Sequence, residues 1–82
     1  MEEPLTEIIR GAILAALPCQ SLQVSGDGKH FEAVVVSAAF EGKSRLARHQ
    51  LVLDSLKERL KEEIHALSIK TFTPQQWQET QH

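Results

Sequence analysis

The chain has 82 residues, of which 41% are hydrophobic and 24% charged, and its formal net charge is −2. This length suits one domain with a small core and leaves little room for a deep, enclosed active site. Residues 1–42 carry two bases and six acids, whereas residues 43–82 carry seven bases and five acids, so the chain as a whole lacks the strongly basic surface typical of a DNA-binding domain.

Cysteine usage and the N-terminus indicate the compartment. Cys19 is the only cysteine, so no intrachain disulfide forms, which fits a reducing environment. The opening residues, MEEPLTE, are acidic and precede no long apolar run, so we expect neither a signal peptide nor a transit peptide. No stretch approaches the roughly 18 apolar residues of a membrane span. We therefore expect a cytoplasmic protein with no membrane association.

The first half of the chain predicts one helix and two strands. Pro4 suits the first turn of a helix, and Pro18 ends it. Between them, apolar residues recur at helical spacing: Leu5, Ile8, Ile9, Ala12, Ile13, Ala16 and Leu17. Leu22 and Val24 alternate with polar residues, and 31–37 reads as a more buried strand. The glycine-rich turn at 26–28 should join the two strands in an antiparallel hairpin.

The middle segment predicts helix after Gly42, with Ser44 as its cap. Apolar residues and one histidine follow at spacings of three and four: Leu46, His49, Val52, Leu53, Leu56, Leu60 and Ile64. One long helix would satisfy this pattern. However, Ser55 and Glu58 have the spacing of a capping box, which favours two consecutive helices that break near Asp54 and Ser55.

Residues 65–72 alternate again and predict a third strand, with His65 on the same face as Leu67. Thr73 and Gln76 form a second capping-box pattern around Pro74, which predicts a short helix near 75–79, and the polar residues 78–82 should fray. We therefore expect an α+β fold of order α-β-β-α-α-β with a short C-terminal helical turn. Its three-stranded mixed sheet is covered by helices on one face, and residues 1–82 form a single domain.

Sequence motifs for catalysis are missing. The chain has no GxxxxGK[ST] loop, no CxxC, no HExxH and no GxSxG. Glu41 to Ser44 ends like a phosphate loop, but Ser37 occupies the position of the first glycine. Glu62 and Glu63 read as a solvated helix face. We therefore do not expect an enzyme.

The histidines and the cysteine each allow more than one interpretation. His65 is either a strand-end histidine that donates to a backbone carbonyl or a metal ligand. His30 follows the hairpin turn and alone reads as a solvated loop histidine. His49 reads as a capping or packing residue, with a ligand as the alternative. Cys19 lies in a loop and reads as a partly buried, unreactive thiol, because no basic cluster is near it in sequence.

Basic residues exceed acidic residues across the two predicted middle helices. The six basic residues in this segment are Lys43, Arg45, Arg48, Lys57, Arg59 and Lys61. They are either solvated helix charge or a surface for an anion, which could be nucleic acid, glutathione or the acidic patch of a partner.

Several motifs together resemble the BolA-like family. They are VVVS at 34–37, FEGKSRL at 40–46, RHQ at 48–50, IHALSIKT at 64–71 and TPQQW at 73–77. The turn GDGKHF at 26–31 is similar to that of the family's second, shorter subgroup. The resemblance covers nearly the whole chain and implies the BolA fold, which is similar to a class II KH domain. The family lacks the GxxG loop with which KH domains clamp nucleic acid, and so does this chain.

The resemblance also implies two functions. Family members pair with a monothiol glutaredoxin and share a [2Fe–2S] cluster, held by glutaredoxin cysteine, glutathione and BolA side chains. The histidine of the IHA motif, His65 here, is the family's ligand, and the loop between the first two strands offers His30 as the second. The isolated protein should then carry no cluster and be a monomer or a weak homodimer.

The other implied function is that of a DNA-binding transcriptional regulator linked to stress. Lys43, Arg45 and Arg48 would form its surface for DNA or for a partner. We expect an adaptor in iron–sulfur trafficking or iron sensing, with the transcriptional regulator as the alternative.

Overall fold

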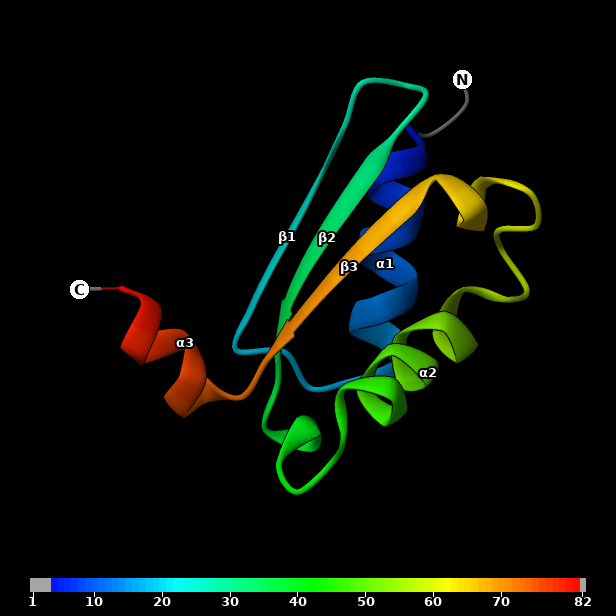
Figure 1. The fold of residues 1–82 in the computed structure, drawn as a ribbon. Coiled ribbons are helices and arrows are strands. Elements are labelled where there is room, and N and C mark those ends of the chain that lie inside the picture. The colour runs from blue at the N-terminus through cyan, green and yellow to red at the C-terminus, as the bar shows by residue number, and fades with distance from the viewer. Residues whose placement is uncertain (1–3, 82) are drawn as a thin grey trace.

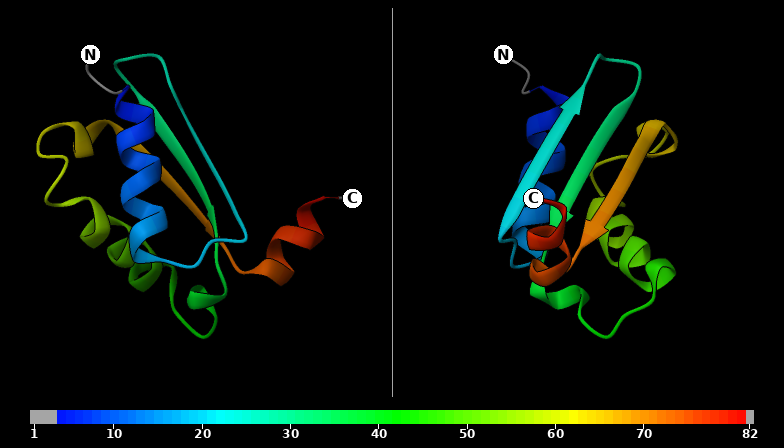
Figure 2. Two further views of the ribbon diagram at one scale, coloured as in Figure 1. Left: turned by 180° about the vertical axis from the view of Figure 1, so that it is seen from behind. Right: turned by 60° about the vertical axis from the view of Figure 1, so that its left-hand side comes forward.

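The computed structural model describes residues 4–81 and contains one mixed sheet with helices. The elements are α1 (Leu5–Ala16), β1 (Ser21–Gly26), β2 (Phe31–Val36), the 3-10 turn η1 (Ala38–Phe40), α2 (Arg45–Leu56), the 3-10 turn η2 (Glu63–Ala66), β3 (Leu67–Phe72) and α3 (Pro74–Thr80). The strand order is β1-β2-β3, with β1 antiparallel and β3 parallel to β2. The views in Figures 1 and 2 place α1 and α2 on one face of this sheet. The predicted fold class is confirmed.

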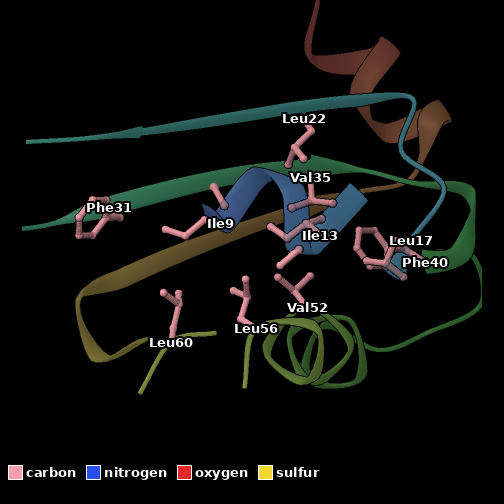
Figure 3. Packing of buried hydrophobic residues seen from close by; sticks show 12 residues of the cluster. Ile9, Ile13, Leu17, Leu22, Phe31, Val35, Phe40, Val52, Leu56 and Leu60 are labelled. Carbon is pink, nitrogen blue, oxygen red and sulfur yellow. The ribbon is translucent and has the colours of Figure 1, made fainter. Parts of the chain in front are cut away.

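The core lies between the sheet and these two helices (Figure 3). Alternate residues of β2, Phe31, Ala33 and Val35, point into it, as the two-residue period of a strand requires. The helices contribute fully buried side chains at helical spacing, Ile9 and Ile13 from α1 and Val52 and Leu56 from α2. Phe40, from η1, is also fully buried. The sparse aromatic content therefore does not prevent a dense aliphatic core.

Among the described residues 4–81, helix α3 covers the opposite face of the sheet at one end (Figure 2). Val36 points away from the helices by strand alternation, yet it is fully buried. Its register partner is Phe72, whose ring packs against that of Trp77 on α3, with ring centroids 5.3 Å apart. Helix α3 projects from the end of β3, away from α1 and α2 (Figure 2). This aromatic pair therefore anchors α3 at the end of β3 where Val36 lies.

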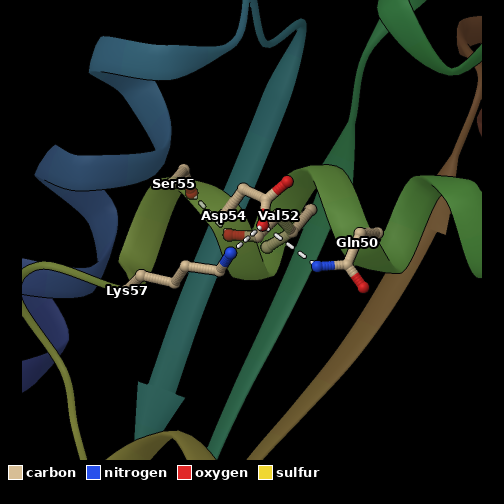
Figure 4. Close-up of polar contacts among 5 residues, drawn as sticks. All are labelled: Gln50, Val52, Asp54, Ser55 and Lys57. Carbon is tan, nitrogen blue, oxygen red and sulfur yellow. Dashed lines mark hydrogen bonds and ion pairs between the residues drawn. The ribbon is translucent and has the colours of Figure 1, made fainter.

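The predicted second middle helix is wrong. Helix α2 runs through Asp54 and Ser55 and ends at Leu56, and residues 57–62 form turns before the four-residue η2. Figure 4 shows the reason: the Ser55 hydroxyl donates to the Val52 carbonyl at 2.6 Å inside the helix, so it caps nothing. Asp54 accepts from Gln50 and pairs with Lys57 at 2.9 Å on the same exposed face.

The apolar spacing that suggested a second helix is satisfied by irregular chain. Leu60 is 2% exposed and Ile64 is half-buried, and both pack on the core from the segment between α2 and β3. The helical spacing of the apolar residues therefore predicted correctly that Leu60 and Ile64 pack on the core, but not that the chain there is irregular.

The ends of the chain follow the predicted signals. Pro4 immediately precedes α1 as its N-cap. Thr73 and Gln76 form the predicted capping box with Pro74 in the first turn. The predicted fraying from residue 78 is wrong up to Thr80, since α3 continues to Thr80 and the Thr80 hydroxyl donates to the Trp77 carbonyl at 2.7 Å. His82 lies outside the described residues. Among residues 4–81, no helix has the length and apolar character to cross a bilayer.

Candidate functional site

The turn between β1 and β2 holds His30 in a defined position. The Asp27 carboxylate accepts from the backbone N–H groups of His30 and Lys29 at 2.8 and 2.9 Å, and the Asp27 N–H donates to the His30 carbonyl at 3.1 Å. These N–H groups, His30 first and Lys29 second, lower the pKa of the Asp27 carboxyl below its ordinary value. The His30 backbone is therefore fixed at both its donor and its acceptor, while its side chain stays exposed.

Two glycines make this turn possible. Gly28 has φ of +95°, a conformation that side chains disfavour. A Cβ at Gly26 would clash with the Phe31 ring and lie within 2.9 Å of the His30 carbonyl oxygen. The GDG sequence that predicted the hairpin is thus also what orients His30.

His65 lies in η2, not in a strand. The predicted strand face shared with Leu67 is wrong, because β3 begins at Leu67 and His65 precedes it within a 3-10 turn. Its backbone N–H donates to the Glu62 carbonyl at 3.1 Å, and the residue is exposed. The imidazole is therefore at the surface and not on the rim of the core.

The parallel pairing of β2 and β3 brings the two histidines to one end of the sheet. Phe31 pairs with Leu67, so His30 directly precedes one strand and His65 stands two residues before the neighbouring one. Figure 1 shows the β1–β2 turn and η2 at this same end. We call this pair the histidine end.

The histidine end offers two imidazole donors. Within residues 4–81, no group of three or more His, Cys, Asp or Glu side chains is arranged to hold a metal ion. A [2Fe–2S] cluster takes four ligands. The two histidines could therefore supply at most half of such a ligand set.

The three bases proposed from the sequence lie together in a groove at the other end of β3. Lys43, Arg45 and Arg48 line it with His49 from α2; the remaining lining residues are Ile69, Lys70, Thr71, Phe72, Gln76, Glu79 and Thr80. Its volume is about 680 Å³. Lys70 and Gln76 were not predicted, because only the sheet order brings them to α2. We call this the basic groove.

Arg48 connects the walls of the basic groove. Its Nη1 donates to the Gln76 side-chain oxygen at 2.8 Å, and its Nε donates to the Lys43 carbonyl at 3.0 Å. The same Gln76 oxygen accepts from the Thr73 N–H at 3.0 Å within the capping box. Arg48 therefore joins the start of α2 to the start of α3 and is structural as well as charged.

Cys19 stays apart from both sites. It is half-buried, its thiol donates to the Leu17 carbonyl at 3.6 Å, and burial raises its pKa while Arg10 opposes the shift. The thiol is therefore protonated near neutral pH, in keeping with the unreactive role expected from the sequence.

Comparison with known proteins assigns the family. A family model described as BolA-like protein matches residues 12–76. The acid stress protein IbaG of Escherichia coli is 41% identical over 70 residues, covering 84% of this chain and 83% of IbaG. A Vibrio cholerae protein named DNA-binding transcriptional regulator BolA is 46% identical over 54 residues, covering 66% of this chain and 51% of the regulator.

Solved structures agree with this assignment. The solution structure of BolA1 from Mus musculus has a TM-score of 0.81 and 36% identity to this chain, covering 99% of this chain and 74% of that one. The names of the two relatives describe a stress protein and a regulator, not enzymes. From the family match, the relatives and the shared fold together, we conclude that this chain belongs to the BolA-like family.

Proposed function

We propose that this protein is a non-enzymatic adaptor that offers His65 and His30 to a [2Fe–2S] cluster shared with a monothiol glutaredoxin and glutathione. The observation that carries the proposal is the position of both exposed histidines at the same end of two neighbouring parallel strands. A pair of donors at the surface suits a cluster completed by a partner, because the remaining ligands approach from outside the domain.

The donor type fits the proposed cargo. Neutral imidazoles in place of thiolates raise the reduction potential of a bound cluster, and imidazole protonation favours its release. Such a site suits transfer or sensing. Asp27 would act as a positioning residue, since its carboxylate fixes the backbone that carries His30.

Visible circular dichroism of a mixture of the protein, cluster-loaded glutaredoxin and glutathione tests the proposal. We expect the wild-type mixture to give a heterodimer spectrum that changes with His65→Ala and with His30→Ala. His49→Ala, which removes a histidine from the basic groove instead, is the matched control and should leave the spectrum unchanged. His30 and His65 are exposed, so their substitutions should alter stability by no more than about 0.5 kcal/mol. His49 is half-buried, so thermal unfolding is used to check that this control variant is folded.

Each outcome has a definite meaning. An unchanged spectrum for His65→Ala shows that the ligand assignment is wrong. A spectrum altered by His65→Ala but not by His30→Ala places the second ligand elsewhere. Sedimentation of the same variants with cluster-free glutaredoxin separates lost ligation from a lost protein interface.

A second candidate function is DNA-binding transcriptional regulation through the basic groove. Lys43, Arg45 and Arg48 line a single groove, which supports a common anionic ligand, and a relative carries the name of a DNA-binding regulator. Affinity for duplex DNA should fall as salt rises, by counterion release.

Fluorescence anisotropy with promoter fragments at several salt concentrations tests this second function. Arg45→Ala should reduce the slope of log K against log salt by about 1, whereas Lys61→Ala, outside the groove, should not. Binding no stronger than that of unrelated DNA at moderate salt argues against the regulator.

A further inference from the structure

The basic groove contains a free strand edge. The strand order leaves β3 at one edge of the sheet. The Phe72 carbonyl accepts from the Ser37 N–H at 3.0 Å, so Phe72 directs its backbone groups toward β2. Because residues alternate along a strand, Ile69 and Thr71 direct their N–H and C=O groups the other way. Both residues line the groove, which therefore presents two main-chain donors and two main-chain acceptors.

Positive charge flanks this edge on the side of the sheet that the helices cover. Lys43 and Arg45 are exposed at the start of α2, on the side of the sheet that the helices cover. Lys70 belongs to the opposite face, where its ammonium group lies 3.5 Å from the Glu32 carboxylate. Among residues 4–81, Glu79 is the one acidic residue that lines the groove.

We propose that the basic groove binds an extended acidic segment of a partner protein, which adds to β3 as a fourth strand. Backbone pairing with Ile69 and Thr71 would hold the segment, as in other cases of strand addition. Acidic side chains at every second position would then point toward Lys43 and Arg45. The groove segment 69–72 spans about 13 Å at 3.3 Å per residue, which suits a segment of four or five residues.

The groove suits a peptide better than nucleic acid. A phosphate backbone has no N–H groups to donate to the free carbonyls of β3. Proteins that bind single strands stack bases on aromatic rings, but the aromatic residue of this groove, Phe72, is already packed against Trp77. The overall charge of −2 also disfavours a long polyanion, whereas a segment with two or three carboxylates needs only the local cations.

The alternative is that these cations prevent other chains from pairing with the strand edge. Charged side chains at a sheet edge deter pairing with other chains and so prevent aggregation. This alternative predicts that the edge binds no peptide saturably. The proposal predicts a saturable complex that depends on both the charge and the backbone N–H groups of the peptide, so binding measurements separate the two.

The test titrates the ¹⁵N-labelled protein with the peptide acetyl-Thr-Glu-Val-Glu-Val-Glu-Gly-amide. We expect saturable amide shifts at Ile69 and Thr71 and slower hydrogen exchange of these two amides. The same peptide with N-methyl groups on both valines keeps its charge but loses two N–H donors, so it should bind about 5- to 160-fold more weakly, the range for two hydrogen bonds. A peptide with lysine in place of glutamate should not bind.

Protein variants test the charge requirement. The double substitution of Lys43→Ala with Arg45→Ala should weaken binding about 2- to 30-fold, the range for two exposed ion pairs. Lys61→Ala, beyond the groove, is the control and should bind as the wild type does. Equal affinity for the N-methylated peptide, no saturable binding, or displacement of the peptide by equimolar duplex DNA would each overturn the proposal.

Discussion

Ser37 joins three parts of the fold, and its replacement gives a sharp test of how they are held. The residue is fully buried just after β2. Its hydroxyl donates to the Pro18 carbonyl at 2.6 Å and accepts from the Ala39 N–H at 3.0 Å. Its backbone N–H and C=O pair with Phe72 and Phe40. One buried serine thus links the end of α1, the end of β3 and the turn that inserts Phe40 into the core.

Ser37→Ala removes the two hydroxyl bonds and leaves both backbone bonds in place. A typical hydrogen bond contributes about 0.5–1.5 kcal/mol, so two should contribute about 1–3 kcal/mol. For a small domain with about 5–15 kcal/mol in total this is a large loss. With a urea m-value near 1 kcal/mol/M, the midpoint should fall by about 1–3 M.

Urea unfolding followed by far-UV circular dichroism measures this loss. Ser68→Ala is the matched control, because Ser68 is exposed on the open face of β3, and its stability should change by less than about 0.5 kcal/mol. A Ser37→Ala midpoint equal to that of the control would refute the reasoning that this network stabilises the fold.

Three further predictions concern the core, the helix that was mispredicted and the His30 turn. Phe40→Ala should destabilise the domain by about 3–5 kcal/mol, measured by thermal unfolding, because its ring is fully buried. Ser55→Ala should leave stability unchanged or raise it by up to about 0.5 kcal/mol, because alanine is the better residue inside a helix; a loss near 1 kcal/mol in urea would instead indicate a cap. The hydrogen bonds of the Asp27 carboxylate should stabilise the turn fully above the ordinary carboxyl pKa of 3.8, and this stabilisation should be lost as pH falls through the lower pKa of the folded state. The reason is that the folded carboxyl binds its proton more weakly than the unfolded one. The amide resonances of His30 and Lys29 should titrate together at that lower pH, and titration at the ordinary value would contradict the hydrogen bonds.

Local chemistry made the hairpin and the C-terminal helix predictable. The glycine-rich turn after β1 needs positive φ and a missing Cβ, and both needs are visible in the sequence at Gly26 and Gly28. The Thr73 capping box is likewise a short-range interaction that forms as predicted. Features that depend on interactions within about four residues of chain could therefore be predicted from the sequence.

Features that depend on tertiary packing could not be predicted from the sequence. Ser55 and Glu58 have the same spacing as a capping box, but burial of Leu56 keeps Ser55 inside α2, which ends at Leu56. His65 and Leu67 are two residues apart, which fits one face of a strand, but His65 lies in a 3-10 turn. A pattern of only two positions could not distinguish a strand from such a turn. Likewise, Lys70 joins the groove only because β3 is an edge strand.

The pairing of β3 with β2 separates the two candidate surfaces. The histidine end precedes Leu67, whereas the basic groove begins at Ile69 and extends past Phe72 to α3. Ile69 is two residues, or about 7 Å, beyond Leu67, and the groove continues from there to α3. Substitutions at His65 and at Arg45 share no contact and should therefore act additively on any function that uses both. If both proposals hold, a cluster partner at one end and an acidic segment at the other would act on different surfaces, and the two binding reactions should be measurable independently.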